Sequence, residues 1–262
     1  MPKCSAYGCV MLLWCTAGMV WAEVQTKTVT YRDGDTTCVG YLAWDDAHRE
    51  PRPGVLVLHE WWGLDEYAKK RARQLAELGY VALAADMYGE GKTVDHPQDA
   101  GAMAARVRAN VQGWRRRAQA GLSTLKQQPP CNPQRVAVIG YCFGGATALQ
   151  LAYSGAEIQA VATFHAALPT PSPEEARAIK PRILVCHGAD DTFISAEAIN
   201  KFRQALDDAH VMYEFLSIPG AVHSFTVPDA DRHNVPGLKY HREADELSWK
   251  KMRELFAQTI DR

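Results

Sequence analysis

The strongest constraint on the fold is a repeated alternation of short apolar runs with longer amphipathic stretches. The apolar runs predict strands at 55–58, 80–85, 135–139, 160–164, 182–186 and 211–218. Helical patterns occupy 65–78, 97–125, 144–153, 196–206 and 241–260. Strands that alternate with helices of this length form a mainly parallel sheet with helices on both faces. The sequence therefore predicts an α/β fold.

The segment ahead of this pattern predicts an antiparallel edge. Residues 26–31 and 37–44 flank the turn signal Arg32-Asp33-Gly34-Asp35, which is typical of a β-hairpin. With these two strands we expect a sheet of about eight. Four cysteines follow residue 22. A bridge between Cys38 and Cys131 is the pairing to test first, with free thiols as the equal alternative.

The first 22 residues resemble a secretory signal peptide. Lys3 supplies a positive start, residues 10–20 form an apolar run, and Val20-Trp21-Ala22 precedes the expected cleavage site. The run is short for a membrane span, and a lipoprotein or a retained anchor is the alternative. We expect a single domain, residues 23–262, that is secreted or periplasmic and free of the membrane once the signal is removed.

The charge balance argues against several classes of partner. The chain has 29 Lys and Arg against 30 Asp and Glu, so no broad field attracts nucleic acid or an anionic membrane. The basic run Arg115-Arg116-Arg117 is interpreted as the solvated face of a helix. His59 and Glu60 lack a second pair with ligand spacing, so we expect no metal.

Cys142 is the candidate nucleophile. The segment Gly140-Tyr141-Cys142-Phe143-Gly144 lies where a predicted buried strand turns into a helix, which is the nucleophile-elbow pattern with cysteine in the serine position. Glycine on either side removes the Cβ atoms that would clash in so tight a turn. The start of the helix favours a thiolate. The competing interpretation is a small buried core residue.

The chain also offers an acid and a base in the order nucleophile, acid, histidine that hydrolases with such an elbow use. Asp191 and His223 each follow a predicted strand, and the carboxyl ends of parallel strands meet at one edge of the sheet. His223 would take the proton of the thiol, and Asp191 would orient the imidazole. Asp190 is the alternative acid. Two further strand-end histidines are interpreted as site lining or structural residues: His165 and His187.

The loop after residues 55–58 completes the predicted site. The amides of Trp61 and Phe143 would form the oxyanion hole. Glu60 would face the sulfur or the ester and hold the free nucleophile in check, because a neighbouring carboxylate disfavours a thiolate. The alternative for Glu60 is a solvent-facing loop acid. Aromatic residues are predicted to wall the pocket, with core packing as the equal alternative: Trp62, Tyr88, Phe164 and Phe225.

Taken together, these motifs resemble those of the dienelactone hydrolases (carboxymethylenebutenolidases) over residues 24–262. The resemblance rests on Gly-Tyr-Cys-Phe-Gly-Gly at 140–145, Asp191 before Phe193-Ile194, His223 within 220–225, and His59-Glu60 before Trp61-Trp62-Gly63. It implies an α/β-hydrolase fold with a cysteine triad and no cofactor. It also implies oxyanion amides at Trp61 and Phe143, gating of the thiol by Glu60, and lactone or activated ester substrates.

Two positions depart from that family's pattern. Its well-studied members bind the carboxylate of dienelactone with two arginines, and the matching positions here hold Glu90 and Val227. A carboxylate would lose its bidentate partners and meet a like charge. Lys92, Arg232 or Lys239 would compensate only if loops bring them in. We therefore expect a neutral or differently charged small substrate.

The sequence predicts a monomeric hydrolase of a small ester or lactone that acts through Cys142, His223 and Asp191 and a thioester intermediate. A second hypothesis is a non-catalytic thiol-sensing or ligand-binding protein of the same fold. A third is a serine-type esterase in which Cys142 is an incidental replacement.

Overall fold

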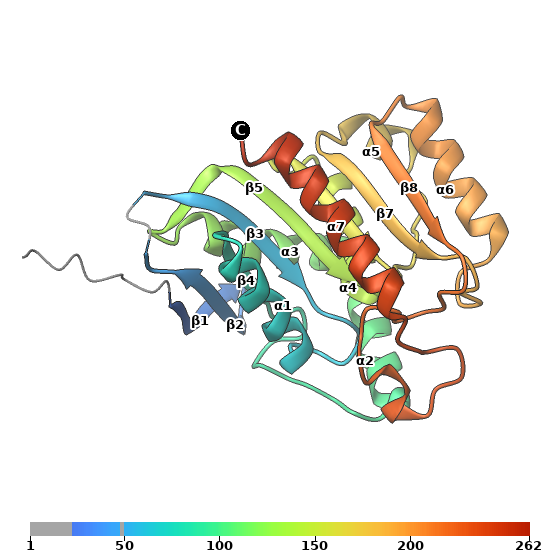
Figure 1. The fold of residues 1–262 in the computed structure, drawn as a ribbon, viewed down its shortest axis with the longest axis horizontal. Coiled ribbons are helices and arrows are strands. Elements are labelled where there is room, and N and C mark those ends of the chain that lie inside the picture. Colours follow the sequence, from blue (N-terminus) through green and yellow to red (C-terminus); the bar gives the residue numbers. More distant parts are fainter. Residues whose placement is uncertain (1–22, 48–49) are drawn as a thin grey trace, which may run out of the picture.

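Eight strands form one sheet in the order β1-β2-β4-β3-β5-β6-β7-β8 in the computed structural model, which describes residues 23–47 and 50–262 (Figure 1). The strands are β1 (Val24–Asp33), β2 (Thr36–Asp45), β3 (Arg52–Leu58), β4 (Val81–Ala85), β5 (Cys131–Tyr141), β6 (Ala160–Phe164), β7 (Arg182–Gly188) and β8 (Tyr213–Ile218). The pairs β1–β2 and β2–β4 are antiparallel, and the other pairs are parallel. The predicted α/β-hydrolase architecture, with its antiparallel edge, is therefore confirmed. The predicted signal peptide, residues 1–22, lies outside the described residues.

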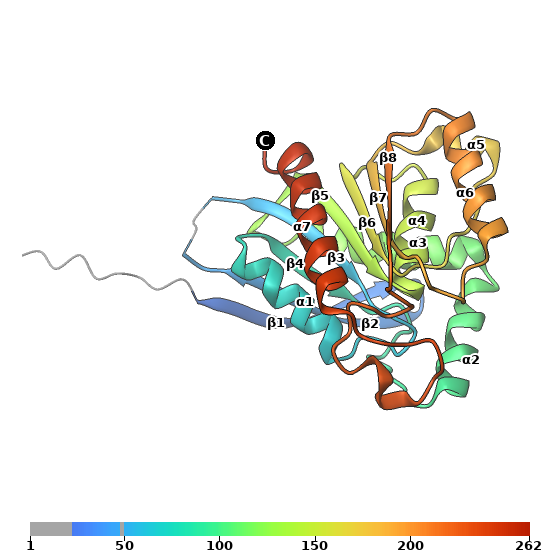
Figure 2. The same cartoon turned by 45° about the vertical axis from the view of Figure 1, so that its right-hand side comes forward.

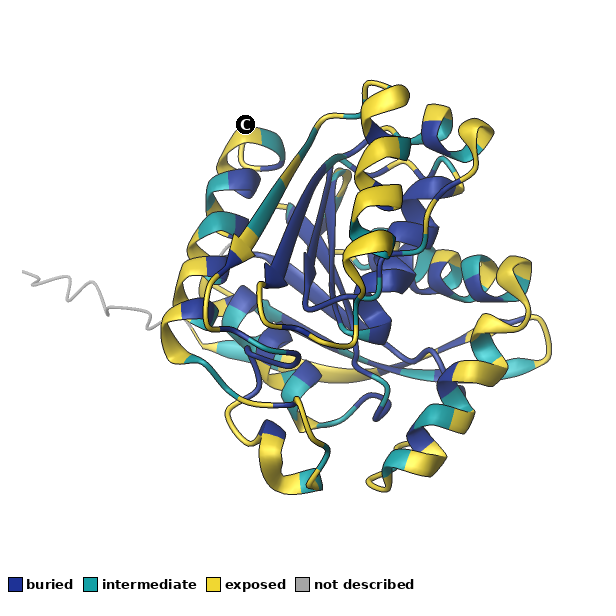
Figure 3. Cartoon of the chain, turned by 90° about the vertical axis from the view of Figure 1, so that its right-hand side faces the viewer, coloured by how far each residue is buried: buried dark blue, intermediate teal, exposed yellow. Residues whose placement is uncertain are grey.

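Helices cover both faces of this sheet. They are α1 (Glu66–Glu77), α2 (Pro97–Arg108), α3 (Val111–Lys126), α4 (Phe143–Tyr153), α5 (Pro173–Ala178), α6 (Ala196–Asp208) and α7 (Arg242–Thr259), with a short 3-10 helix at Ala230–His233. Helices α1 and α7 pack on one face, and α3, α4 and α6 pack on the other (Figures 1 and 2). The central strands are buried, as expected for a parallel sheet covered on both sides (Figure 3). In the part of the chain described, no helix is both long and apolar enough to cross a membrane.

Side-chain caps decide where several helices begin. Asp65 accepts a hydrogen bond from the amide of Ala68 and starts α1. The stretch at 97–125, predicted as mostly helical, is two helices, because the side chain of Asn110 accepts the amide of Gly113 and starts α3 anew. A proline-rich loop at 169–173 runs directly into α5, a helix that was not predicted from the sequence. Its capping box at Ser172 was present as a local signal.

The bridge considered between Cys38 and Cys131 does not form. Cys38, Cys131, Cys142 and Cys186 are all free thiols. Cys38 lies on β2 and Cys131 on β5, and β4 and β3 lie between these strands. Three strand spacings amount to about 14 Å, beyond the reach of a disulfide. Sequence patterns located both strands but not their order in the sheet, which decides the question.

Candidate active site

Cys142 lies at the tight corner between β5 and α4. Its backbone has φ 50° and ψ −113°, a strained geometry for a residue with a side chain. A Cβ atom on Gly140 would lie 2.1 Å from the carbonyl oxygen of Gly144, and one on Gly144 would lie 2.1 Å from the carbonyl oxygen of Leu58. Both positions therefore require glycine, and the corner holds the half-buried sulfur at the carboxyl edge of the sheet.

Asp191 and His223 meet at the same edge. Nδ1 of His223 donates to Oδ2 of Asp191 at 2.7 Å, and both side chains are buried. The other carboxylate oxygen of Asp191 accepts the amide of Phe193 at 2.9 Å. Asp190, the alternative acid, is exposed. Of the two neighbouring acids, Asp191 is the one that orients the imidazole.

The pKa of His223 depends on the neighbouring sulfur of Cys142. Burial alone lowers the pKa of His223, but the charge of Cys142 and hydrogen bonds with Asp191 and Cys142 together raise this pKa to about 10. The ring thus holds a proton firmly between a carboxylate and a sulfur. Such an arrangement can keep the proton that the thiol has given up and pass it to a leaving group.

Glu60 is a buried acid and not a solvent-facing loop residue. Its side chain is 4% exposed, and its Oε1 accepts a hydrogen bond from Oγ of Ser224 at 2.8 Å. Nδ1 of His165 lies 3.6 Å from the same oxygen. Burial raises the pKa of Glu60 to about 7, against the opposing effects of the Ser224 hydrogen bond and the charge of His223. The carboxyl group therefore faces Ser224, the immediate neighbour of the predicted base.

A network of polar side chains begins at His165, next to Glu60, and was not predicted from the sequence. Nε2 of His165 is 2.7 Å from Oγ1 of Thr226, which is 2.6 Å from the hydroxyl of Tyr67. Arg71 donates to that hydroxyl at 3.0 Å and to the carbonyl of Thr226 at 3.0 Å, and it forms an ion pair with Asp245. These residues come from distant parts of the chain. No local motif links them, so no sequence signal was available.

The two amides predicted for the oxyanion hole belong to residues that follow the neighbouring strands β3 and β5. Leu58 on β3 pairs with Gly140 on β5, and Trp61 and Phe143 each follow three residues later. Phe143 is the first residue of α4, where the helix leaves amides without internal partners. The hydroxyl of Tyr88 donates to the carbonyl of Trp61 at 2.7 Å and so fixes that loop.

The four aromatic residues predicted for the pocket divide into two pairs. Trp62 borders a cavity of about 280 Å³ that Glu60 and Ser224 also line, and Tyr88 borders a second cavity of about 230 Å³. Phe164 and Phe225 are fully buried in the core on the side of α1 and α7. This burial agrees with the core-packing alternative. Residue types and spacing could not show which side of the sheet each ring occupies.

The positions that depart from the family pattern hold no positive charge. The carboxylate of Glu90 is 66% exposed and pairs with Lys92 at 2.7 Å. Val227 is buried and lines the 280 Å³ cavity, where Arg232 is also found, paired with Asp229. Lys239 is exposed.

His59 has a structural place in this site. Its ring is fully buried, and its Nε2 accepts the amide of Met87 at 3.1 Å. Residues 23–47 and 50–262 contain no group of three or more His, Cys, Asp or Glu side chains that could hold a metal ion.

Comparison with known proteins agrees with the fold. The model of the dienelactone hydrolase family matches residues 39–260. A protein of Aquifex aeolicus named as a candidate carboxymethylenebutenolidase is 28% identical over 200 residues, which is 75% of this chain and 85% of that protein.

Two solved structures are more similar. The structure named m3DLH is 42% identical with a TM-score of 0.88, and the match covers 90% of this chain and 99% of that one. The dienelactone hydrolase-like promiscuous phosphotriesterase P91 from metagenomic libraries is 41% identical with a TM-score of 0.88, over 91% and 99% of the two chains. The chain therefore belongs to the dienelactone hydrolase family.

Proposed function

We propose that this hydrolase cleaves small esters or lactones through Cys142, His223 and Asp191. The observation that carries the proposal is the position of His223, which bonds to Asp191 on one side and interacts with the sulfur of Cys142 on the other. The names of the relatives, which include a carboxymethylenebutenolidase and a dienelactone hydrolase-like enzyme, support an ester or lactone as substrate.

The reaction proceeds in two balanced steps. The sulfur of Cys142 attacks the carbonyl carbon, the oxyanion is held by the amides of Trp61 and Phe143, and the alcohol leaves with the proton of His223. The thioester is then attacked by water, whose proton passes to His223, and the carboxylic acid leaves as Cys142 is restored. For a lactone, the alcohol and the acid belong to one product molecule.

The departures from the family pattern bear on the substrate. Because Glu90 and Val227 replace the two arginines, we expect dienelactone to lose its usual carboxylate contacts. Esters without an anion at that place are therefore favoured. Neutral phosphotriesters belong in the same screen, because P91 is named a promiscuous phosphotriesterase.

The test is turnover of p-nitrophenyl acetate by residues 23–262. We expect hydrolysis that falls by at least about 10³-fold in Cys142→Ala, while Cys131→Ala, which removes a buried thiol remote from the site, stays close to wild type. Cys142→Ser should also lose most activity, whereas a serine-type esterase would gain. An absence of turnover with any short ester, together with reversible oxidation of Cys142, would establish the thiol sensor instead.

We also propose that residues 1–22 direct export and are then removed. Support comes from the charge and apolar run of that segment. The test is the mass of the protein recovered from the periplasm or medium of an expressing bacterium. A chain that begins at Glu23 supports the proposal, and a cytoplasmic chain that retains Met1 contradicts it.

A further inference from the structure

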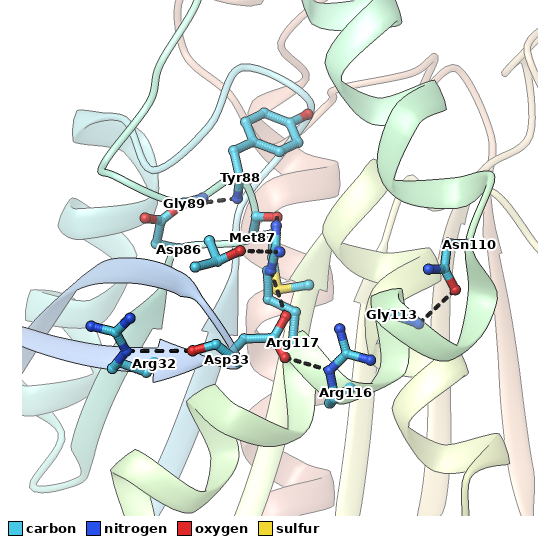
Figure 4. Close-up of polar contacts among 12 residues, drawn as sticks. Arg32, Asp33, Asp86, Met87, Tyr88, Gly89, Asn110, Gly113, Arg116 and Arg117 are labelled. Atoms are coloured by element: carbon cyan, nitrogen blue, oxygen red, sulfur yellow. Dashed lines mark hydrogen bonds and ion pairs between the residues drawn. The ribbon is translucent and has the colours of Figure 1, made fainter.

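A cavity of about 230 Å³ lies between α2, α3 and the loop after β4, and four cationic side chains line it. They are Lys92, Arg106, Arg116 and Arg117. Among the described residues, no Asp or Glu lines this cavity, and its aromatic walls are Tyr88 and Trp114. Figure 4 shows Arg116 and Arg117 on α3, with Tyr88 and Asn110 on the segments that flank it.

Arg116 and Arg117 on α3 share the same acidic partner. Nε of Arg116 and Nε of Arg117 donate to the two oxygens of the same buried carboxylate, Asp33, at 2.6 and 3.0 Å. Arg117 has further bonds to the carbonyl of Met87 and the hydroxyl of Thr36. The terminal nitrogens of Arg116 make no hydrogen bond within the described part of the chain, and its side chain is 63% exposed. They are free to meet a ligand.

The wall of the cavity formed by α2 also carries a positive charge without an acidic partner among the described residues. Arg106, near the end of α2, is exposed and forms no ion pair with any acid in the two described segments. Lys92 is balanced by Glu90. The first turn of α3, at Asn110 and Gly113, also borders the cavity and adds the positive end of a helix. Two positive charges therefore remain in excess around a hollow with two aromatic walls.

The cavity adjoins the candidate active site through Tyr88. This ring lines the cavity, while its hydroxyl holds the loop of Trp61. Burial and then the charge of Cys142 raise the pKa of Tyr88. The ring of Phe143, directly after Cys142, lies 5.7 Å from the rings of both Tyr88 and Trp114. Two walls of the cavity, Tyr88 and Trp114, are thus in ring contact with the residue that follows Cys142.

We propose that this cavity binds an anionic group, a carboxylate or a phosphate, at the end of the substrate remote from the ester that Cys142 attacks. Arg106 and Arg116 supply the recognition, because a guanidinium with free nitrogens can meet such an anion through two hydrogen bonds. The assignment rests on the proposed function and names its substrate class. The anion is held by side chains of α2 and α3, and not by the residues at positions 90 and 227.

The kinetic test compares a matched pair of esters, p-nitrophenyl butyrate and the mono-p-nitrophenyl ester of glutaric acid. Wild type should prefer the anionic ester, mainly through KM. Arg106→Gln should lower the anionic-to-neutral ratio of kcat/KM about fivefold, and adding Arg116→Gln should lower it about tenfold or more. Raising the ionic strength should erode the same preference. Arg253→Gln, which removes an exposed cation from the far end of α7, should leave the ratio unchanged.

Binding of glutarate to Cys142→Ala protein, followed by calorimetry, separates this proposal from the proposed function, because it needs no turnover. Binding that weakens with Arg106→Gln, together with competition between glutarate and the anionic ester, supports the assignment. An unchanged ratio in the folded double variant, or a loss that follows Arg232→Gln instead, overturns it. Glutarate that binds without competing would mark the cavity as an effector site and overturn the substrate assignment.

Discussion

Burial of the Glu60 carboxyl group should lower the free energy of unfolding at neutral pH, and Glu60→Gln should restore this stability. The folded pKa is about 7 against an ordinary value of 4.5. Between these pH values the folded state keeps a proton that the unfolded state releases, so stability falls as pH rises from 4.5 to 7. A difference of about 2.5 units corresponds to about 3 kcal/mol at pH 8.

The glutamine variant keeps the shape of the protonated acid and an oxygen that accepts from Ser224. Its free energy of unfolding should match wild type at pH 4 and exceed it by about 3 kcal/mol at pH 8. For a domain of this size that corresponds to a Tm higher by about 6 to 12 °C. The group is 4% exposed, so solvent screening reduces this figure little.

The assay is urea unfolding of wild type and variant from pH 4 to pH 8. Glu77→Gln, which neutralises an exposed acid at the end of α1, is the control and should give a difference that stays near zero across this range. A constant difference between wild type and Glu60→Gln, or one that shrinks as pH rises, would refute the reasoning. In that event Glu60 is charged in the folded state well below pH 7.

Three further perturbations follow from the same geometry. Gly144→Ala should destabilise the fold by about 3 kcal/mol or more in urea unfolding, because the new Cβ collides with the carbonyl of Leu58, and wild-type stability would contradict the elbow. Asp191→Asn should keep the fold but lower kcat/KM for p-nitrophenyl acetate about a hundredfold or more, since His223 loses its charged partner; unchanged kinetics would remove Asp191 from the mechanism. Ser224→Ala removes a hydrogen bond that favours the charged form of Glu60, so the pKa of Glu60 should rise further. In urea unfolding, the loss of stability with rising pH should then extend above pH 7. A loss of stability that is half complete below pH 7 would contradict this.

The arrangement of elements could be predicted because each left a strong local signal. Strand 160–164 is apolar except for Thr163 and matches β6, and the turn at 32–35 joins β1 to β2 as expected. The need for glycine on both sides of Cys142 could be predicted, because a Cβ atom there collides with the backbone in any such strand-to-helix turn. These features depend on neighbours in sequence, which is why periodicity and turn chemistry were sufficient.

Other features of the site depend on neighbours in space. The choice of Asp191 over Asp190 agrees with the contact to His223, but spacing alone could only favour it. The hydrogen bond between Ser224 and Glu60 joins residues 164 positions apart, and no sequence pattern in either segment predicts it. Phe164 ends a strand that is apolar except for Thr163, yet the face that its ring occupies follows from which helices cover that face. Strand order and helix placement are tertiary properties.

The central claim is that the sulfur of Cys142 becomes acylated during turnover. The most direct measurement is the intact mass of the protein, acid-quenched within milliseconds of mixing with excess p-nitrophenyl acetate, followed by peptide mapping. We predict one added acetyl group on the peptide that contains Cys142, formed at the rate of the first release of p-nitrophenol. An acetyl group on another residue, or full turnover by Cys142→Ala protein, would contradict it.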